Sequence, residues 1–520
     1  MYLKLFFILL LYLNQNYIWA STNDNVSSLI YSAQYKKALK LNASLCQQYS
    51  NQLNQQWADC LSMNGVIKVK LGDYQGSEPD FKKALSIRKK LFDKNHLSVA
   101  NSLNDLGELY RHRGEYHKPE LLYQKALSIR LKKLGKQHAL TAEIYKNLGE
   151  LYHDRGEYLK AEQFYNKAIG ILNISKNTEN KKNELALAEV KTWLAMLYQE
   201  QDMLVEAEVL YQLGLAARYR LLGQSHPETL DSVMGLASLY ISKGDYELSM
   251  SLVLMAKHFL DKSNFNLHPD YARALGLLAL IYDYYGENKK AEDNYSQVLQ
   301  IYLRVYGKHN IMTAYVYSDL GWLFLSKKNY KKSREYFNKA LRIRVNTLST
   351  EHQEVADSKK DLANVAMRQG QAQQAEAFLL ESLSIYGNTL GENSITKSSV
   401  LNQLVKLNWQ RGKMQRAVDF MAQAEKIQEL EIQRFLVSGS ERQKIAYMNT
   451  LKNQNDLIVS LHIQGLIKSK SAKKLALNMI LRRKGRVIDV LAENNIRKIL
   501  PKLPEKIKAQ VVGWKKLLDL

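Results

Sequence analysis

The sequence predicts an all-α protein built as an α-solenoid, in which helical hairpins repeat along most of the 520 residues. Two nearly identical stretches, residues 106–129 and 148–171, follow one another along the chain. Each stretch places apolar residues at helical spacing, breaks at a glycine and then resumes the spacing, which is typical of two helices joined by a tight turn. We therefore expect a right-handed solenoid of about nine to ten helix-turn-helix repeats, followed by a helical C-terminal segment.

The predicted turn can be followed through nine units. In sequence number, the steps between successive turn residues are 42, 42, 45, 43, 42, 42, 42 and 42. Such regularity predicts one continuous stack, because each hairpin of a solenoid buries its apolar face against its neighbours. The predicted turn residues are Gly72, Gly114, Gly156, Gln201, Gly244, Gly286, Lys328, Gly370 and Gly412.

The order of small and large apolar residues in each unit resembles that of tetratricopeptide repeats. In the unit at 148–171, Leu148 and Gly149 precede Tyr152, and Tyr158 and Ala161 follow the turn. The usual period of that family is about 34 residues, and the longer unit is similar to the repeats of kinesin light chains. HEAT repeats have a comparable period and are the alternative. The resemblance implies a superhelix over residues 57–437 that binds peptides or proteins in a groove lined by the first helix of each hairpin.

The chain is strongly basic, with 74 Lys and Arg against 51 Asp and Glu, a formal net charge of +23. Residues 439–520 hold 18 basic and 6 acidic residues, a net +12. Such a segment can attract acidic partners, so weak contact with anionic surfaces through residues 439–520 is one expectation. A solvated helical surface is the other. Nucleic-acid binding is not expected, because the basic run at 481–486 has no interleaved aromatic residues.

Residues 1–20 have the features of a secretory signal peptide. Lys4 precedes an apolar run over residues 5–13, and Ala20 is a plausible cleavage site. This apolar run is too short to span a bilayer as a helix, and no later segment approaches the length required. We expect an exported protein, periplasmic or extracellular. The alternatives are an uncleaved anchor and a cytoplasmic protein.

An irregular N-terminal helical unit is predicted over residues 21–56, as expected for the end of a repeat array. The two cysteines, Cys46 and Cys60, fall on what should be successive antiparallel helices. A disulfide and a pair of small buried residues are both compatible with this spacing. A zinc or catalytic role is not expected, because no histidine signature lies nearby.

Histidines recur about once per unit in the loops between hairpins. A solenoid spaces such residues along its length instead of bringing them together, so no metal site is expected. Pro227 and Pro269 follow two of them, as expected at the start of a helix, and a structural role is predicted. The six histidines are His96, His138, His226, His268, His309 and His352.

The resemblance to tetratricopeptide repeats places a binding groove on the first helices. The groove positions are polar in the early units, apolar and aromatic in the middle, and mixed later. An apolar band of this kind is a candidate binding surface, with Trp193, Tyr284, Tyr315 and Trp322 as aromatic anchors. Alternatively, these residues are buried against the opposite wall, or the C-terminal segment occupies the groove. The candidate groove residues are Asn104, Asn147, Trp193, Met196, Met234, Leu277, Tyr284, Tyr315, Trp322 and Asn364.

The repeat ends at about Phe435, but the spacing of apolar residues beyond it still predicts helices. The runs SGSERQKIAYMNTL (438–451) and LNMILRRKGRVIDVL (477–491) resemble the helical connector of bacterial proteins that join tetratricopeptide repeats to a CHAT domain. CHAT domains are caspase-like, and active members use a catalytic His and Cys. No cysteine follows Cys60. Residues 438–520 are therefore predicted to be a basic connector without the CHAT domain itself.

Two hypotheses for function follow. The sequence has no P-loop, dinucleotide fingerprint, zinc-protease motif, CxxC or nucleophile elbow, so no enzyme activity, cofactor or catalytic residue is expected. The first hypothesis is a non-catalytic scaffold that binds a protein or peptide partner in the groove. The alternative is the sensor or regulatory arm of a CHAT-type cysteine peptidase whose catalytic domain is truncated or lost.

Overall fold

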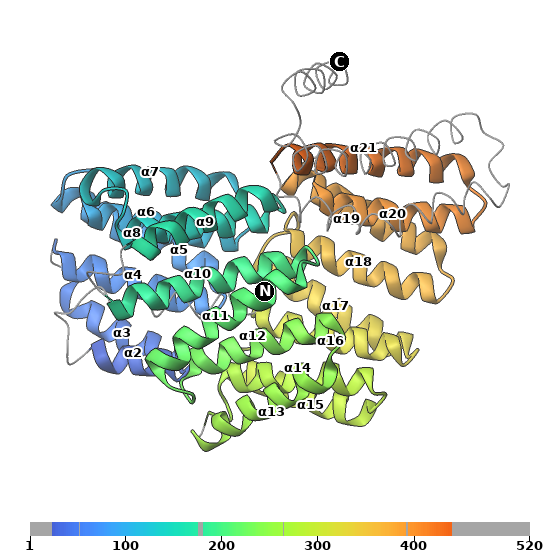
Figure 1. Ribbon diagram of the computed structural model, residues 1–520, viewed down its shortest axis with the longest axis horizontal. Helices are drawn as coiled ribbons and strands as arrows, with labels where there is room; N and C mark the ends of the chain where they lie inside the picture. Colours follow the sequence, from blue (N-terminus) through green and yellow to red (C-terminus); the bar gives the residue numbers. More distant parts are fainter. Residues whose placement is uncertain (1–22, 51–52, 175–179, 264, 392–393, 439–520) are drawn as a thin grey trace, which may run out of the picture. The chain divides into compact units, whose positions relative to one another are not determined.

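The computed structural model describes residues 23–50, 53–174, 180–263, 265–391 and 394–438, and within these ranges all of its regular structure is helical (Figure 1). Within the described residues, twenty helices alternate as first and second members of hairpins, which confirms the predicted all-α hairpin repeat. The first helices are α2 (Asn23–Tyr31), α4 (Gln55–Lys70), α6 (Leu97–His112), α8 (Ala139–Asp154), α10 (Asn180–Glu200), α12 (Pro227–Lys243), α14 (Pro269–Tyr284), α16 (Ile311–Ser326), α18 (Gln353–Arg368) and α20 (Ile395–Gln410). The second helices are α3 (Tyr35–Tyr49), α5 (Tyr74–Leu91), α7 (His117–Leu134), α9 (Tyr158–Ile174), α11 (Leu204–Leu222), α13 (Tyr246–Lys262), α15 (Asn288–Val305), α17 (Tyr330–Thr347), α19 (Ala372–Leu390) and α21 (Met414–Ser438).

The chain divides into two compact units, Met1–Leu407 and Asn408–Leu520. Apart from the turn at Gly412, all features discussed below lie in the first unit. The predicted signal peptide lies outside the described residues, as does the predicted connector beyond Ser438 with both runs that resemble the CHAT-associated segment. The predicted domain boundaries stay predictions.

The hairpin turns contain one residue with a left-handed backbone. In the turn after α6, Gly114 has φ 73°, Glu115 N–H donates to the Tyr110 carbonyl, and Gly114 N–H donates to that of Arg111. This arrangement satisfies carbonyls that the end of a helix leaves free. The predicted turn residues have positive φ, with one correction: Asp202, at φ 60°, takes the place predicted for Gln201. The extra residues of that unit therefore precede the turn.

Small residues on the first helix let the second helix pack closely. A Cβ added at Gly149 would lie 2.5 Å from the Tyr165 ring, and one at Gly321 would lie 2.6 Å from the Phe337 ring. Both rings are fully buried. In each of these hairpins the aromatic ring of the second helix therefore packs directly against the glycine of the first helix.

Buried arginines join successive hairpins. Arg344 of α17 donates to the Ser318 hydroxyl on α16 at 3.0 Å and to the Ser358 hydroxyl on α18 at 2.6 Å. The same arrangement, with hydroxyl partners 26 residues before and 14 residues after the arginine, recurs elsewhere. It holds Arg88 between Ser62 and Ser102 and Arg218 between Thr192 and Ser232.

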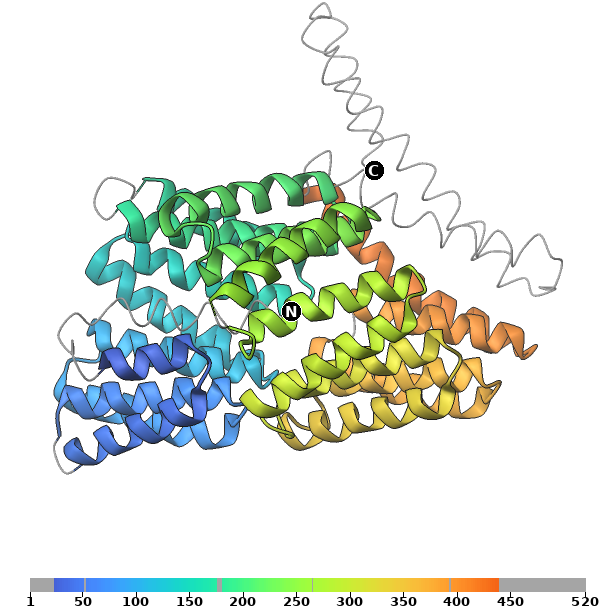
Figure 2. The same cartoon turned by 90° about the horizontal axis from the view of Figure 1, so that it is seen from below.

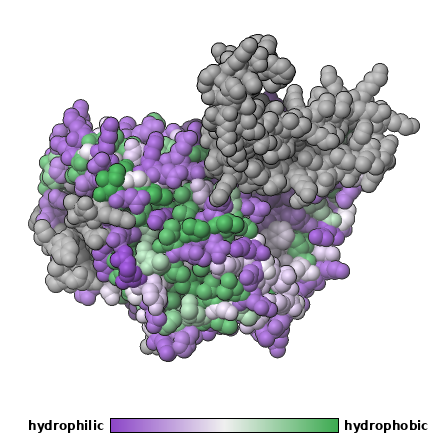
Figure 3. Space-filling model, viewed as in Figure 1, coloured by the Kyte–Doolittle hydropathy of each residue, from purple (hydrophilic) through white to green (hydrophobic). Residues whose placement is uncertain are grey.

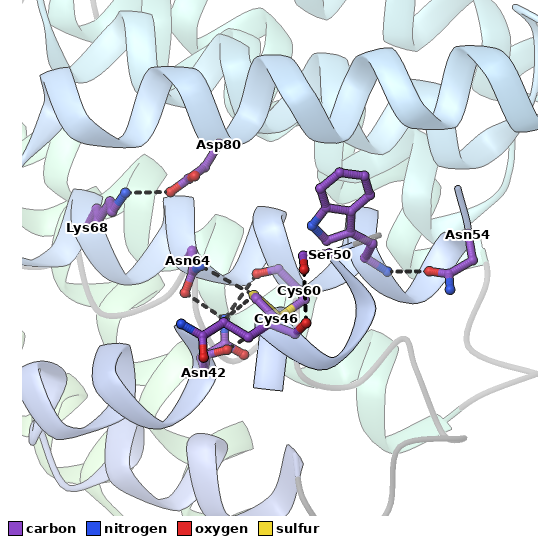
Figure 4. Close-up of a disulfide and its surroundings, with 10 residues drawn as sticks. Asn42, Cys46, Ser50, Asn54, Cys60, Asn64, Lys68 and Asp80 are labelled. Atoms are coloured by element: carbon purple, nitrogen blue, oxygen red, sulfur yellow. Dashed lines mark hydrogen bonds and ion pairs between the residues drawn. A yellow bond between two sulfur atoms is a disulfide. The ribbon is translucent and has the colours of Figure 1, made fainter. Parts of the chain in front are cut away.

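The N-terminal unit is cross-linked. Cys46 of α3 and Cys60 of α4 form a disulfide, with 5.6 Å between their Cα atoms (Figure 4). Asn42 donates to the Cys60 carbonyl at 3.0 Å, and Asn64 donates to the Cys46 sulfur at 3.3 Å. Of the two arrangements open at the sequence level, the structure has the disulfide.

The first unit also brings distant parts of the chain together. Figure 2 shows α2–α5 beside the segments that lead into α14 and α16. Tyr35 stacks on Tyr306 with ring centroids 5.8 Å apart, and the apolar core around Tyr35 includes Val305 and Leu348 at its edge. The first hairpin therefore packs against helices from the second half of the chain.

Candidate binding surface on the first helices

In the early hairpins, polar side chains of neighbouring first helices bind one another. Asn147 of α8 donates to Asn104 of α6 at 2.7 Å, and Lys146 of α8 pairs with Glu189 of α10 at 2.8 Å. Burial lowers the pKa of Lys146, but Glu189 and Glu150 outweigh it and raise this pKa overall. The candidate residues Asn104 and Asn147 are thus buried parts of a polar network, and they present little surface to a partner.

Several of the apolar candidates are also buried. Trp193 and Met234 belong to the hydrophobic core, and Tyr315 is largely buried with its hydroxyl hydrogen-bonded to Glu354 at 2.5 Å. Burial of this kind was the alternative open at the sequence level. Binding by these three residues would require the hairpins to move apart, and their place in a binding groove stays a prediction.

Two of the remaining candidates, Met196 and Leu277, line a cavity of ≈ 440 Å³. Four successive first helices contribute to it, so we call it the inner pocket. Its lining includes Met196 of α10, Leu277 and Leu280 of α14, and Val316 of α16. The polar lining residues are Gln199, Glu200, Ser238, Ser242, Arg273 and Asp319.

Three exposed apolar side chains lie on α14 and α16, the helices that form one side of the inner pocket. Leu280 is 46% exposed, Tyr284 is 61% exposed and Trp322 is 44% exposed. Tyr284 stacks on Tyr246 at 3.6 Å, and Trp322 meets the Phe337 ring edge-on at 5.6 Å. We call Leu280, Tyr284 and Trp322 the apolar ridge. Asn364 of α18 is partly buried and donates to the Lys360 carbonyl.

The charged groups of the inner pocket are held in place by their neighbours. Arg273 forms an ion pair with Asp231 of α12. Burial raises the pKa of Asp231 to about 6, although Arg273 opposes the shift. Glu200 accepts a bond from His153 at 2.8 Å. A ligand would therefore meet preorganised polar groups around an apolar floor, which is the usual chemistry of a binding pocket.

The sequence did not single out Arg273 and Asp319. Each lies on the same helical face as a predicted residue, because Arg273 precedes Leu277 by four positions and Asp319 precedes Trp322 by three. Counting back from each turn residue in steps of three or four along every first helix would have identified both Arg273 and Asp319.

The recurring histidines cap helices. The Nδ1 atoms of His96, His138, His226, His268 and His352 accept from the backbone N–H two residues later, at 3.1–3.3 Å. The predicted structural role is confirmed for these five. In the unit of His309 the cap of α16 is instead the next residue, Asn310, whose Oδ1 accepts from Met312 N–H at 2.8 Å. In the described part of the chain, no group of three or more His, Cys, Asp and Glu residues could hold a metal ion.

A second apolar surface lies on an outer helix. Val205, Val209 and Leu213 recur every four residues along α11 and are exposed. Figure 3 shows apolar residues gathered over the α10–α14 part of the first unit. Among the described helices, none is both long and apolar enough to cross a membrane.

Comparison with known proteins identifies the repeat. The tetratricopeptide repeat family matches residues 60–132, 120–173, 270–344 and 354–429, just over half of the chain. No curated protein matches the sequence.

Three solved structures are among those similar to parts of this chain. BtubC (BKLC) from P. vanneervenii is 22% identical, with 44% of this chain and 91% of that chain covered and a TM-score of 0.37. The nearly identical TPR-like repeats of a Podosopora anserina putative kinesin light chain are 23% identical, with 39% and 95% covered and a TM-score of 0.32. Aspartyl phosphate phosphatase F from Bacillus subtilis is 16% identical, with 71% and 93% covered and a TM-score of 0.45.

Proposed function

Since the chain belongs to the tetratricopeptide repeat family, we propose that it is a non-catalytic scaffold that binds a peptide or protein segment in the inner pocket. The observation that carries this proposal is a cavity of ≈ 440 Å³ lined in part by the exposed Leu280, with Tyr284 and Trp322 exposed on the same two helices, α14 and α16. That volume lies within the range of about 300–1,000 Å³ that is usual for ligand pockets. Exposed aromatic residues beside such a pocket can supply the anchor contacts that dominate binding energy.

The groups around the pocket favour an extended segment over a single small molecule. Lining residues come from α10, α12, α14 and α16, so a ligand would cross successive first helices. Gln199 and Ser242 offer amide and hydroxyl groups that a peptide backbone can bind, and they already bind each other at 2.8 Å. The ridge residues would take apolar side chains of the same segment.

The test begins with a selection of random dodecapeptides displayed on phage. The tightest peptide is then synthesised and titrated calorimetrically against Trp322→Ala and Leu280→Asp. Each change should weaken binding at least tenfold, because a buried anchor at the centre of an interface contributes about 2 kcal/mol or more. Circular dichroism establishes that each variant is folded.

Val209→Ala is the matched control, because Val209 is an exposed apolar residue of α11 that does not line the inner pocket. It should leave the affinity unchanged. Loss of binding in Val209→Ala together with full binding in Trp322→Ala would move the site to α11 and sink the proposal.

We also propose that the protein is exported. The apolar run after Lys4 supports export, and so does the Cys46–Cys60 disulfide, because disulfides persist in oxidising compartments.

The second candidate function is the regulatory arm of a CHAT-type peptidase. It rests on the runs at 438–451 and 477–491, and a native mass well above 59.9 kDa would favour it.

A further inference from the structure

Three contacts of one kind join helices that lie far apart in the sequence. His268 Nε2 lies 3.1 Å from the Tyr31 carbonyl, and Asn310 Nδ2 donates to the Lys70 carbonyl at 3.5 Å. His352 bonds to the backbone of His112 in the same way. Tyr31, Lys70 and His112 are the last residues of α2, α4 and α6, where carbonyls lack partners within the helix. We call these three contacts the seam.

Each seam side chain caps two helices at once. Asn310 Oδ1 accepts from the N-terminus of α16 while its Nδ2 donates to the C-terminus of α4. The ring of His268 does the same, with Nδ1 toward Asp270 N–H and Nε2 toward α2. With Nδ1 accepting from the Asp270 N–H, Nε2 is the nitrogen that donates to the Tyr31 carbonyl.

The backbone at the seam leaves no spare room. A Cβ on Gly72 would lie 2.9 Å from Asn310 Nδ2, and one on Gly114 would lie 2.6 Å from the His352 ring. The three cap residues His268, Asn310 and His352 are almost fully buried. The seam is therefore a packed interface along successive hairpins.

Apolar contacts extend the seam at the first hairpin. The Tyr31 ring lies 6.1 Å from the Phe265 ring, and Tyr35 stacks on Tyr306. Tyr35 is 3% exposed, so the first hairpin depends on the later helices for burial of its core.

The seam acts on the helices that form the inner pocket. His268 and Asn310 are the caps of α14 and α16. Arg273 and Leu277 follow His268 on α14, and Val316 and Asp319 follow Asn310 on α16, and all four line the pocket. A change in the position of either helix end would change the spacing of these residues.

We propose that the seam is a latch: docking of α2, α4 and α6 on the caps of α14, α16 and α18 holds α14 and α16 at the spacing that forms the inner pocket. Release of the latch loosens the pocket, and a ligand in the pocket tightens the latch, because coupling between two sites is reciprocal. The ligand part of this inference rests on the proposed function.

Substitution by aspartate removes the hydrogen bond to the distant carbonyl and keeps the N-cap hydrogen bond. It therefore tests the latch separately from helix capping. Asn310→Asp is isosteric and keeps an oxygen toward Met312 N–H, but it replaces the donor to Lys70 by a second oxygen. His268→Asp likewise keeps an N-cap acceptor and removes the donor, but it also places a carboxylate beside that of Asp270, which lies 3.2 Å from His268 Nδ1. His268→Asn keeps both functions, as Asn310 does, and serves as the rescue variant. His96→Asp is the matched control, because His96 caps α6 at a position outside the seam.

The first readout is hydrogen–deuterium exchange of the whole protein, which needs no ligand. In the double variant His268→Asp/Asn310→Asp, amides of α2–α3 and of the pocket-lining turns of α14 and α16 should exchange at least tenfold faster. His96→Asp and His268→Asn should match the wild type in these segments. Faster exchange confined to the first turns of α14 and α16 would overturn the latch, because it would show a capping effect alone.

The second readout uses the phage-selected peptide. The double variant should bind it at least fivefold more weakly, and the peptide should slow exchange in α2–α3 of the wild type. Unchanged affinity in a variant whose α2–α3 exchanges rapidly would refute the coupling to the pocket. If no peptide binds the wild type, the proposed function fails, and the exchange measurement still decides whether the latch exists.

Discussion

A histidine at a helix N-cap works only while its ring is neutral, because the Nδ1 lone pair must accept from the backbone. For His226 and His352, whose pKa values are lowered by burial, the cap therefore ties helix stability to pH. His352 is the extreme case. Burial, opposed by Asp357 and helped by Arg344, lowers its pKa to about 4.

This shift predicts a loss of stability in acid. Below about pH 6.5 the unfolded chain binds a proton at His352, whereas the folded chain does so only near pH 4. The free energy of unfolding should thus fall as the pH decreases from 6.5 to 4, by about 3 kcal/mol at most from this residue. Urea unfolding at pH 4.5, 5.5, 6.5 and 7.5 measures it.

His352→Asn is the control for this prediction, because asparagine keeps the cap and does not titrate. Its unfolding free energy should decline less than that of the wild type over the same pH range. Parallel pH curves for the two proteins would contradict the assignment.

Single residues also show where sequence reasoning stops. Asn104 and Asn147 are polar and fall on the first helices, so periodicity alone places them at the surface of a groove. The structure buries both, because the two amides bind each other across neighbouring helices. Arg344 is buried for the same reason. Whether a polar side chain has a buried partner depends on a neighbour in another helix, often one full repeat away, which a local pattern does not contain.

At the scale of the element, close packing of the two helices of a hairpin such as α16–α17 requires a glycine, which has no side chain, on the first helix. Gly321→Ala would place a methyl group 2.6 Å from the Phe337 ring, which is buried and cannot move away freely. We expect a loss of about 1–3 kcal/mol in the free energy of unfolding. Thermal and urea unfolding provide the measurement.

Gly170→Ala in α9 is the matched control. A Cβ there meets no atom within 4 Å, so the change should stabilise the protein by about 0.5–1 kcal/mol through helix propensity. Equal effects of the two substitutions would show that the contact with Phe337 does not decide the choice of glycine.

The disulfide fixes α3 to α4 at the start of the array. It closes a short loop, with a sequence separation of 14. The double variant Cys46→Ser/Cys60→Ser should lose about 3 kcal/mol. The wild type unfolded in the presence of a reductant should approach the variant, whereas the variant itself should be insensitive to reductant. A variant as stable as the oxidised wild type would show that the other contacts of α3 suffice.

The hairpins themselves were predictable, because the regular period and the glycine turns are written in the sequence. The one wrong turn residue, Gln201, lies in the unit with extra residues, where equal spacing is a poor guide and Asp202 adopts the turn. Part of the inner pocket was also predictable: Met196 and Leu277 were among the candidates, and Arg273 and Asp319 were not.

At the scale of the whole first unit, the seam was beyond prediction. It depends on how many hairpins separate α2 from α14, and hence on the small rotation between neighbours, which accumulates over several repeats. The recurrence of histidine in the loops can be seen in the sequence. The sequence does not show that His268 also bonds to the Tyr31 carbonyl, 237 residues earlier.

The seam also has a consequence for the order in which the protein is made. Synthesis delivers α2 and α3 first, yet Val26 and Tyr35 complete their core with Val305 and Tyr306. At about 5–20 residues per second, the 237 residues between Tyr31 and His268 take about 12 to 47 s to add. Throughout that interval the nascent hairpin exposes apolar surface that no translated residue can yet cover. The hairpin that is made first therefore completes its core only after Val305 and Tyr306 have been made, and until then its exposed apolar surface is open to chaperones.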